Sequence, residues 1–266
     1  MSNFYKDSDE NHLANYKYNN SFKIPLIKVN GINAINAEDT IVSEFPLGLI
    51  VNGKYLNTFL CSPYNLKELV VGYLCFKNLI KSKDDIIELN IDKDSKIASV
   101  KINECELSED EELIYLNQYD FIRTSPIKND NIKINASKIY NVMDLNLSIS
   151  QLFRDTAGVH NISIYSNNKI VVSCEDVARH NAMDKAIGYC ILHNIPLYDK
   201  IVFVSGRLSF EMIKKAAIVK MPIVIAKSAT TNLVIETANK LNMTLVGFVR
   251  GNKMNIYTNP NRITFD

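Results

Sequence analysis

The strongest constraint on the fold is the alternation of short apolar runs with helical patterns from Asn135 to the C-terminus. A strand, a helix and a second strand in succession imply a crossover, which makes neighbouring strands parallel and places helices on the sheet faces. We therefore expect an α/β fold with a mixed, largely parallel sheet. The predicted strands are 159–165, 170–173, 201–205, 223–226, 245–249 and 254–258, and the predicted helices are 137–145, 148–155, 180–194, 210–220 and 231–241.

The first half of the chain has a different pattern, in which apolar and polar residues alternate around turn sequences. This alternation predicts two hairpins, and Asn65 with Glu68 predicts a capping box that opens a helix through Leu79. The expected strands are 24–27, 41–44, 47–52, 55–60, 86–91 and 97–102. We expect a mobile tail over residues 1–22, a smaller N-terminal α+β domain over 23–123 and the larger α/β domain over 124–266.

Composition and charge exclude several classes of protein. Thirty Lys and Arg against 29 Asp and Glu leave a formal charge of +1, whereas a nucleic-acid-binding protein normally carries a basic excess. No apolar run approaches the roughly 20 residues that cross a bilayer, and the polar N-terminus does not resemble a signal peptide. We expect a cytoplasmic protein that binds neither nucleic acid nor membrane.

The chain has five cysteines, which are odd in number, widely spaced and without a C-x-x-C pair or zinc-type spacing. This pattern predicts reduced thiols and no metal site. Apolar neighbours predict burial for Cys61, Cys75 and Cys190. The sequence leaves open whether Cys105 and Cys174 are buried or reactive.

Polar side chains gather where predicted strands end and helices begin. The segments are Glu175–Lys185, Ser205–Arg207 and Ser228–Thr231. Because the carboxyl ends of parallel strands meet at one edge, and helix N-termini offer free amides there, these segments predict an anion-binding site. Each also has a structural explanation: Thr230 or Thr231 as a helix N-cap, and His160 or His180 as a core histidine. The segment 248–253 carries two cations around a Gly-Asn turn, and taken by itself it is better explained as a solvated hairpin turn.

Four blocks of sequence, in order along the chain, resemble the formate dehydrogenase accessory sulfurtransferase family (FdhD/NarQ) from about residue 24 to residue 263. They are Glu-Asp-x-x-Arg-His-Asn-Ala-x-Asp-Lys at 175–185, Ser-Gly-Arg-x-Ser at 205–209, Ser-Ala-x-Thr at 228–231, and Leu-Val-Gly-Phe-x-Arg-Gly-x-x-Met-Asn-x-Tyr-Thr at 245–258. Small departures are Ala157 and Ala178, where the family usually has glycine.

The resemblance implies a cytoplasmic homodimer with a cytidine-deaminase-like core. It implies a sulfur carrier in formate dehydrogenase maturation, which takes sulfur from a cysteine desulfurase and passes it to the molybdenum (or tungsten) cofactor, a bis(molybdopterin guanine dinucleotide). The client enzyme is formate dehydrogenase. Zinc deaminase chemistry is not implied, because His-x-Glu and Pro-Cys-x-x-Cys are both missing. The cofactor-binding residues implied are Phe248, Val249, Arg250, Gly251, Asn252 and Lys253, together with Arg207, Ser228, His160 and His180.

The main departure from the family concerns sulfur. The family carries its persulfide on a cysteine in the loop before the core, but the segment 121–128 contains none, and the hydroxyl of Ser125 cannot carry sulfane sulfur. One hypothesis is a sulfurtransferase that uses another thiol, best placed at Cys174, although the neighbouring acids raise a thiol's pKa. The second is a cofactor-binding chaperone without sulfur transfer, and the third a nucleotide-binding regulator. Enzymatic activity and the catalytic residue therefore stay open.

Overall fold

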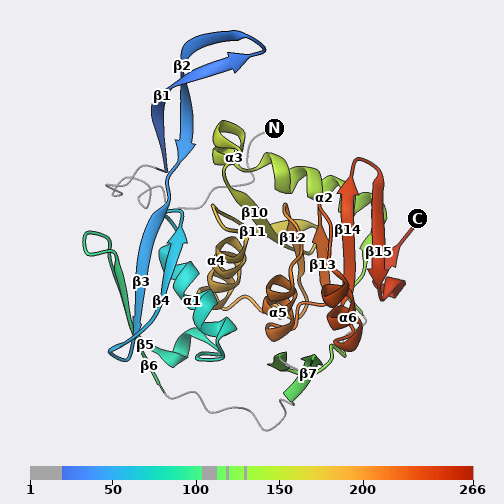
Figure 1. Ribbon diagram of the computed structural model, residues 1–266. Helices are drawn as coiled ribbons and strands as arrows, with labels where there is room; N and C mark the ends of the chain where they lie inside the picture. The colour runs from blue at the N-terminus through green and yellow to red at the C-terminus, as the bar shows by residue number, and fades with distance from the viewer. Residues whose placement is uncertain (1–19, 104–112, 118–119, 129–130, 266) are drawn as a thin grey trace.

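The described part of the chain begins with a projecting β-hairpin. The computed structural model describes residues 20–103, 113–117, 120–128 and 131–265, so most of the predicted mobile tail lies outside it. The hairpin pairs β1 (Ser21–Asn30) with β2 (Asn33–Val42) along their full lengths. It stands clear of the rest of the molecule in Figure 1. The predicted strand 24–27 is thus part of a much longer one, whereas the predicted strand 41–44 overlaps β2 only at residues 41 and 42.

A four-stranded sheet with one helix follows, in the order β4-β3-β6-β5. Both predicted hairpins in this region are confirmed. The first closes through Asn52 and Gly53, whose φ angles of 47° and 78° suit a two-residue turn. The elements are β3 (Phe45–Val51), β4 (Lys54–Cys61), α1 (Leu66–Phe76), β5 (Ile86–Asp92) and β6 (Ile97–Ile102).

The start of α1 differs from the prediction. Asn65 adopts the left-handed conformation, with φ 51° and ψ 40°, and its side chain makes no capping hydrogen bond. A capping box requires an extended N-cap residue, because only then does the side-chain oxygen reach the amides of the first turn. The predicted capping box is therefore wrong, and the helix ends at Phe76 rather than Leu79.

The larger sheet has six strands in the order β11-β10-β12-β13-β14-β15. The pairs β12–β13 and β13–β14 are parallel, and the other three pairs are antiparallel. The prediction of a mixed sheet is confirmed, but the prediction that it is largely parallel is wrong, since hairpins form both edges of the sheet. The strands are β10 (His160–Ser166), β11 (Lys169–Asp176), β12 (Ile201–Val204), β13 (Ile223–Ala226), β14 (Thr244–Arg250) and β15 (Lys253–Thr258).

Helices cover both faces of this sheet (Figure 1). In β12, Val202 and Val204 pack into the core that includes α4, α5 and α6, whereas Ile201 and Phe203 pack on the opposite face with α2. This alternation is the two-residue period of a strand buried on both sides. The helices are α2 (Ala136–Ser148), α3 (Gln151–Thr156), α4 (Arg179–Leu192), α5 (Phe210–Ile218) and α6 (Asn232–Lys240).

The N-terminal sheet and the six-stranded sheet share one hydrophobic core, joined where α1 crosses α4. The crossing is made at Gly72 and Gly188. A Cβ atom on either glycine would lie 1.9 Å from a backbone oxygen of the facing helix. Helices approach this closely only where no side chain separates them. Whether residues 23–123 and 124–266 are separate domains stays a prediction.

Short elements complete the described fold, and none of its helices is long and apolar enough to cross a membrane. The parallel pair β9–β16 joins the segment before α2 to the C-terminus. The short elements are β7 (Leu113–Asn117), β8 (Asp120–Arg123), β9 (Ile134–Asn135), β16 (Ile263–Thr264) and two 3₁₀ turns, Lys83–Asp85 and Pro260–Arg262.

Candidate functional site

A pocket of about 370 Å³ lies where β12 and β13 end and α4 begins. Its walls come from α3 and the segment after it, from the first residue of α4, and from the loops after β12 and β13. Three of the predicted binding residues, His160, Arg207 and Ser228, line it. The other lining residues are Leu147, Phe153, Ala157, Gly158, Val159, Arg179, Ser205, Gly206 and Lys227. Three of the residues predicted to bind an anion at this sheet edge therefore line one concavity, and the anion site itself stays a prediction.

The pocket is positively charged. Arg179, Arg207 and Lys227 line it, and none of its lining residues in the described chain is acidic. Guanidinium and ammonium groups bind phosphate oxygens strongly through charge-assisted hydrogen bonds. The lining therefore favours an anion such as a phosphate or a pyrophosphate.

Three helices begin around this edge without a side-chain cap. The N-cap residues of α4, α5 and α6 are Ala178, Ser209 and Thr231, and none makes a side-chain capping bond. The suggestion that Thr231 caps α6 through its hydroxyl is therefore wrong. Uncapped helix N-termini carry positive partial charge and unpaired N–H groups, both of which suit an anion.

Buried polar atoms in the same segments have no hydrogen-bond partner within the described chain. They are Nε of Arg179, Nδ1 of His180, Oγ of Ser209 and Oγ1 of Thr230. Buried polar groups are nearly always hydrogen-bonded in folded proteins, so unpaired donors that gather at one place indicate a missing polar ligand.

Backbone hydrogen bonds hold the strand-end loops together. The Asn161 amide donates to Oγ of Ser205 at 2.9 Å, and the Phe248 amide donates to the Ser228 carbonyl at 3.1 Å. Gly206 packs directly on His160, because a Cβ atom there would lie 3.1 Å from Nδ1 of the imidazole. The pocket is thus a rigid part of the fold, with its loops positioned by the strands.

The two predicted histidines have different surroundings. His160 lines the pocket, where burial and the nearby Arg179 lower its pKa, so the free protein holds this imidazole neutral near pH 7. His180 does not line the pocket, and its Nδ1 lies 3.5 Å from a carboxylate oxygen of Glu211. Burial lowers the pKa of His180, while Glu211 acts in the opposite direction.

The predicted cofactor loop, 248–253, forms the end of the β14–β15 hairpin and does not line the pocket. A bulge gives Phe248 a φ of 53° and brings its amide to Ser228, while the side chain of Val249 is buried in the core. Cζ of Arg250 lies 5.8 Å from the Phe248 ring centre. Gly251, Asn252 and Lys253 are exposed at the tip.

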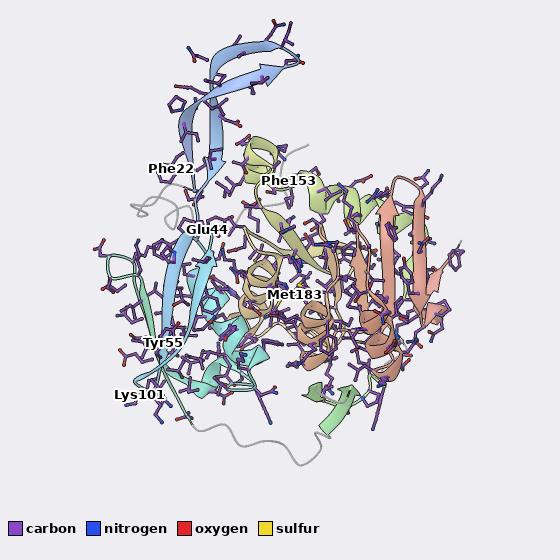
Figure 2. All side chains as sticks on the ribbon, in the orientation of Figure 1. Phe22, Glu44, Tyr55, Lys101, Phe153 and Met183 are labelled. Carbon is purple, nitrogen blue, oxygen red and sulfur yellow. The ribbon has the colours of Figure 1, made fainter. Side chains whose placement is uncertain are left out.

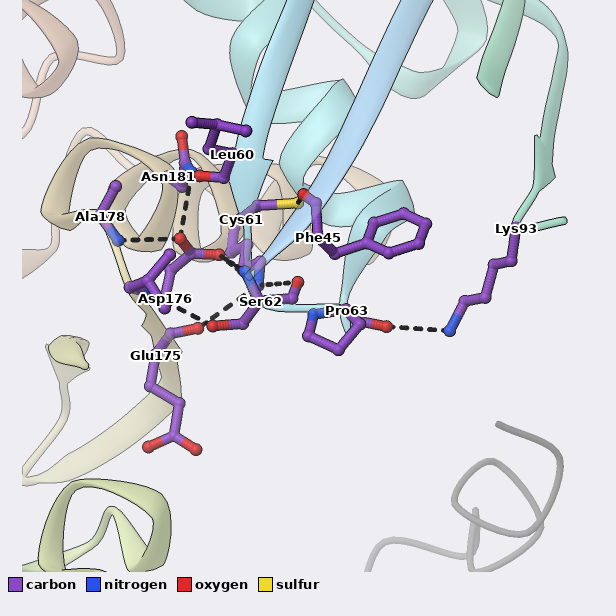
Figure 3. A network of polar contacts seen from close by, with 12 residues as sticks. Phe45, Leu60, Cys61, Ser62, Pro63, Lys93, Glu175, Asp176, Ala178 and Asn181 are labelled. Carbon is purple, nitrogen blue, oxygen red and sulfur yellow. Dashed lines mark hydrogen bonds and ion pairs between the residues drawn. The ribbon is translucent and has the colours of Figure 1, made fainter. Parts of the chain in front are cut away.

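Part of the Glu175–Lys185 motif is structural rather than ligand-facing. The Asp176 carboxylate is fully buried, accepts hydrogen bonds from the Ser62 amide (2.9 Å), the Ala178 amide (3.0 Å) and Nδ2 of Asn181 (3.0 Å), and pairs with Lys185 at 2.7 Å. Figure 3 shows this network at the junction of β4 with the start of α4. It ties the N-terminal sheet to the strand-to-helix turn that carries Arg179.

A second buried ion pair links α4 to α5. Nζ of Lys215 lies 2.7 Å from Oδ1 and 2.8 Å from Oδ2 of Asp184, and 3.8 Å from the Phe76 ring centre. Burial raises the pKa of Asp184 to about 6, against the opposing effect of Lys215. From the motif, Arg179 therefore lines the pocket, while Asp176, Asp184 and Lys185 hold the helices in place.

The segment expected to supply sulfur lies at the opposite end of α5 from the pocket. Nζ of Lys220, just beyond the C-terminus of α5, donates to Oγ1 of Thr124 (2.6 Å) and to Oγ of Ser125 (2.8 Å). Arg207 and the pocket lie at the N-terminal end of the same helix. Ser125, in the segment where the family carries its cysteine, therefore lies away from the pocket.

The four cysteines in the described chain are buried. Burial raises the pKa of Cys61 to about 12 and that of Cys190 to about 12, and it also raises the pKa of the fully buried Cys174. Cys75 and Cys190 line a separate pocket between the C-terminal ends of α1 and α4. Cys105 lies outside the described residues. The placement of Cys174 argues against it as a reactive thiol, because a thiol that stays protonated is a poor nucleophile.

The binding residues proposed from sequence omitted Arg179, Ser205 and Lys227, all of which line the pocket. Arg179 and Ser205 stand in the motifs that were recognised. Lys227 had a weaker signal, a cation directly after a predicted strand. The described residues include no group of three or more His, Cys, Asp or Glu side chains that could hold a metal.

Comparison with known proteins assigns the chain to a family. The model of the FdhD/NarQ family matches residues 42–264. The chain belongs to the FdhD/NarQ family. Its FdhD/NarQ relatives include the "Sulfur carrier protein FdhD" of Bacillus pumilus (strain SAFR-032), which is 40% identical over 238 residues, 85% of this chain and 91% of the relative.

A second relative and a solved structure agree with this assignment to the FdhD/NarQ family. The "Sulfur carrier protein FdhD" of Staphylococcus aureus (strain Newman) is 34% identical over 255 residues, 90% of this chain and 95% of the relative. A crystal structure of a proposed formate dehydrogenase accessory protein from Desulfotalea psychrophila has a TM-score of 0.78 at 22% identity. It covers 92% of this chain and 99% of its own, so the two proteins share a fold along nearly their whole length.

Proposed function

We propose that this FdhD/NarQ protein is a sulfur carrier in formate dehydrogenase maturation that holds the guanine dinucleotide of the molybdenum cofactor in the pocket at the ends of β12 and β13. The observation that carries the proposal is the gathering of Arg179, Arg207 and Lys227 beside unpaired donors at three helix N-termini. The cofactor is the substrate here, and its pyrophosphate groups carry the charge that such a lining binds. A cytidine-deaminase-like core, a homodimer and a cytoplasmic location belong to the same proposal.

The sulfur step needs a thiolate of this chain. That thiolate attacks the sulfane sulfur of a desulfurase persulfide; a new S–S bond forms, the desulfurase S–S bond breaks, and the desulfurase thiolate leaves with the electron pair. The raised pKa values of Cys61, Cys174 and Cys190 disfavour all three as that nucleophile. The same observation favours the second candidate function, a chaperone that binds the cofactor without transferring sulfur.

A labelling experiment distinguishes the two functions. We expect incubation with a cysteine desulfurase and ³⁵S-cysteine to leave reducible label on the wild-type chain, and we expect the label to survive in the Cys61→Ala, Cys174→Ala and Cys190→Ala variants, because these buried thiols stay protonated. The Cys75→Ala and Cys105→Ala variants are tested as well, and the sulfur-carrier function predicts that the label is lost in one of them. The measurement is label retained on a non-reducing gel and released by dithiothreitol.

Calorimetry with GDP supplies the second half of the experiment, since GDP carries the guanosine and diphosphate of the cofactor. GDP binding without label would support the chaperone, and neither label nor binding would contradict both functions. Arg207→Gln tests the pocket, and Arg250→Gln with Lys253→Gln tests the hairpin tip, which lies apart from the pocket lining. A larger loss of GDP affinity in the hairpin-tip variant than in Arg207→Gln would show that GDP binds at the tip rather than in the pocket.

The affinity for GDP is expected to rise as the pH falls. Because His160 has a lowered pKa and is neutral in the free protein, a bound diphosphate raises that pKa and binding takes up a proton. From about pH 8 to about pH 6.5 we expect an increase of about threefold, within the tenfold that corresponds to one pKa unit. Calorimetry at each pH measures it. The phosphate groups of GDP titrate identically in experiments with the matched His160→Gln variant. An equal change of GDP affinity with pH in the two proteins would therefore rule out His160 as the group that takes up the proton.

A further inference from the structure

The β1–β2 hairpin, residues 21–42, is called the arm here, and it exposes an unusual amount of apolar surface. Ile27, Val29 and Ile35 are 65%, 68% and 63% exposed. Large amounts of exposed apolar surface on a folded protein mark a site of interaction with another molecule. The large apolar side chains exposed on the arm are Phe22, Ile24, Ile27, Val29, Ile32, Ile35 and Ile41.

The exposed side chains lie on both faces of the arm. Phe22 pairs with Ile41 across the strands and Ile24 lies on the same face, whereas Ile27 and Val29 point to the other face. A two-stranded hairpin without a covered face is only marginally stable in water. The described chain pairs no third strand with β1 or β2. Free edges of this kind accept an added strand from a partner.

The arm rises from the rim of the pocket. Val42, the last residue of β2, packs so closely on Gly158 that a Cβ atom there would lie 2.7 Å from its Cγ1, and Gly158 lines the pocket. The strand β2 also contacts α3, which contributes Phe153 to the lining. Figure 2 shows Phe22 at the base of the arm and Phe153 on the neighbouring helix.

We propose that the arm is the docking surface for the acceptor apo-protein that receives the ligand of the pocket. The inference rests on the proposed function and names the surface that its client contacts. A protein bound at the base of the arm also covers the rim of the pocket. Because Val42 packs on Gly158 of the pocket lining, an acceptor bound at the arm lies directly beside the ligand that it receives. A homodimer formed through another surface leaves the arm free for that acceptor.

The charges of the arm indicate how the acceptor is recognised. Lys23 and Lys28 on β1 balance Glu38 and Asp39 on β2, so the arm has no net charge to attract a partner at long range. Recognition then depends on apolar contacts and strand pairing. The acceptor surface is expected to offer an apolar groove or a free strand edge.

The test measures binding of the full-length chain to immobilised, cofactor-free formate dehydrogenase from the same organism. We expect an Ile27→Asp, Val29→Asp double variant to bind at least about tenfold more weakly, since buried apolar anchors dominate interfaces. The matched control is Ile87→Asp in β5, which is 55% exposed and lies far from the arm. Unchanged GDP affinity shows that the variant is folded with its pocket intact.

Each outcome decides the inference. Weakened binding in the arm variant alone supports it, and undiminished binding in that variant overturns it while leaving the proposed function standing. Failure of the wild-type chain to bind the apo-enzyme counts against the proposed client as well. A change of oligomeric state in the arm variant, measured by analytical ultracentrifugation, would assign the arm to a second copy and overturn the inference.

Discussion

Replacing Asp176 by Asn is expected to lower the free energy of unfolding by about 3–5 kcal/mol, although the two side chains have nearly the same shape. The carboxylate is fully buried and pairs with Lys185, itself fully buried, at 2.7 Å. Removing its charge leaves an ammonium group in the interior without its counter-ion. The remaining hydrogen bonds of Lys185, to the carbonyls of Ser62 and Glu175, are longer, at 3.2 Å and 3.4 Å, and the Tyr64 ring centre lies 4.3 Å from its Nζ.

Urea denaturation followed by circular dichroism measures the loss. The control is Asp92→Asn in the exposed β5–β6 turn, which is expected to change the unfolding free energy by less than about 1 kcal/mol because its hydrogen bonds are solvated. An Asp176→Asn, Lys185→Met double variant should be more stable than Asp176→Asn alone, because no charge is left unpaired. If the double variant loses as much unfolding free energy as Asp176→Asn and Lys185→Met lose together when each is made alone, the two residues do not act as a pair.

Replacing Gly72 or Gly188 by Ala is expected to destabilise the protein by about 3 kcal/mol at either position, the upper end of the usual cost of overpacking. In an ordinary helix the same change stabilises, by about 0.5–1 kcal/mol, because alanine has less backbone entropy to lose. Here the added methyl would lie 1.9 Å from a backbone oxygen of the facing helix, and backbone cannot move aside as a side chain can. The helices α1 and α4 would have to separate.

The matched control is Gly48→Ala in β3, where a Cβ atom would meet nothing closer than 3.7 Å. Thermal and urea unfolding of the three variants make the comparison, and stable Gly72→Ala and Gly188→Ala proteins would contradict the close helix crossing. Because this crossing joins the N-terminal sheet to the six-stranded sheet, unfolding in two steps in either variant would also reveal whether residues 23–123 and 124–266 behave as separate domains.

Local pattern was sufficient for most of the elements. Strands such as 201–204 and 223–226 and helices such as 210–218 follow from short-range periodicity, and the predicted ranges of these three elements differ from the observed ones by two residues at most. The sheet was less predictable. The β10–β11 hairpin closes through Asn167 and Asn168, both with positive φ. The four residues between the predicted strands 159–165 and 170–173 are too few for a crossover, so this pair was predictable as antiparallel. The antiparallel pairing of β10 with β12 was not predictable in this way, because the long connection between them suits either direction.

The candidate site was also predictable only in part. The motifs at the strand ends identified Arg207, Ser228 and His160, because the carboxyl ends of neighbouring strands meet at one edge. They did not separate the residues of the Glu175–Lys185 motif into those that face the pocket and those that are buried. Burial depends on the packing of α1 and β4 against α4, which is separated from them by more than a hundred residues of sequence.

The sequence alone determined the order of strands and helices, the family resemblance and the absence of a cysteine from 121–128, because each depends on residue type and spacing along the chain. The tertiary structure decided which motif residues meet. It paired Asp176 with Lys185 in the core and Asp184 with Lys215, and it left Arg179 on the pocket wall. It also put Ser125 and the pocket at opposite ends of α5, since helix packing sets distances that sequence spacing does not record.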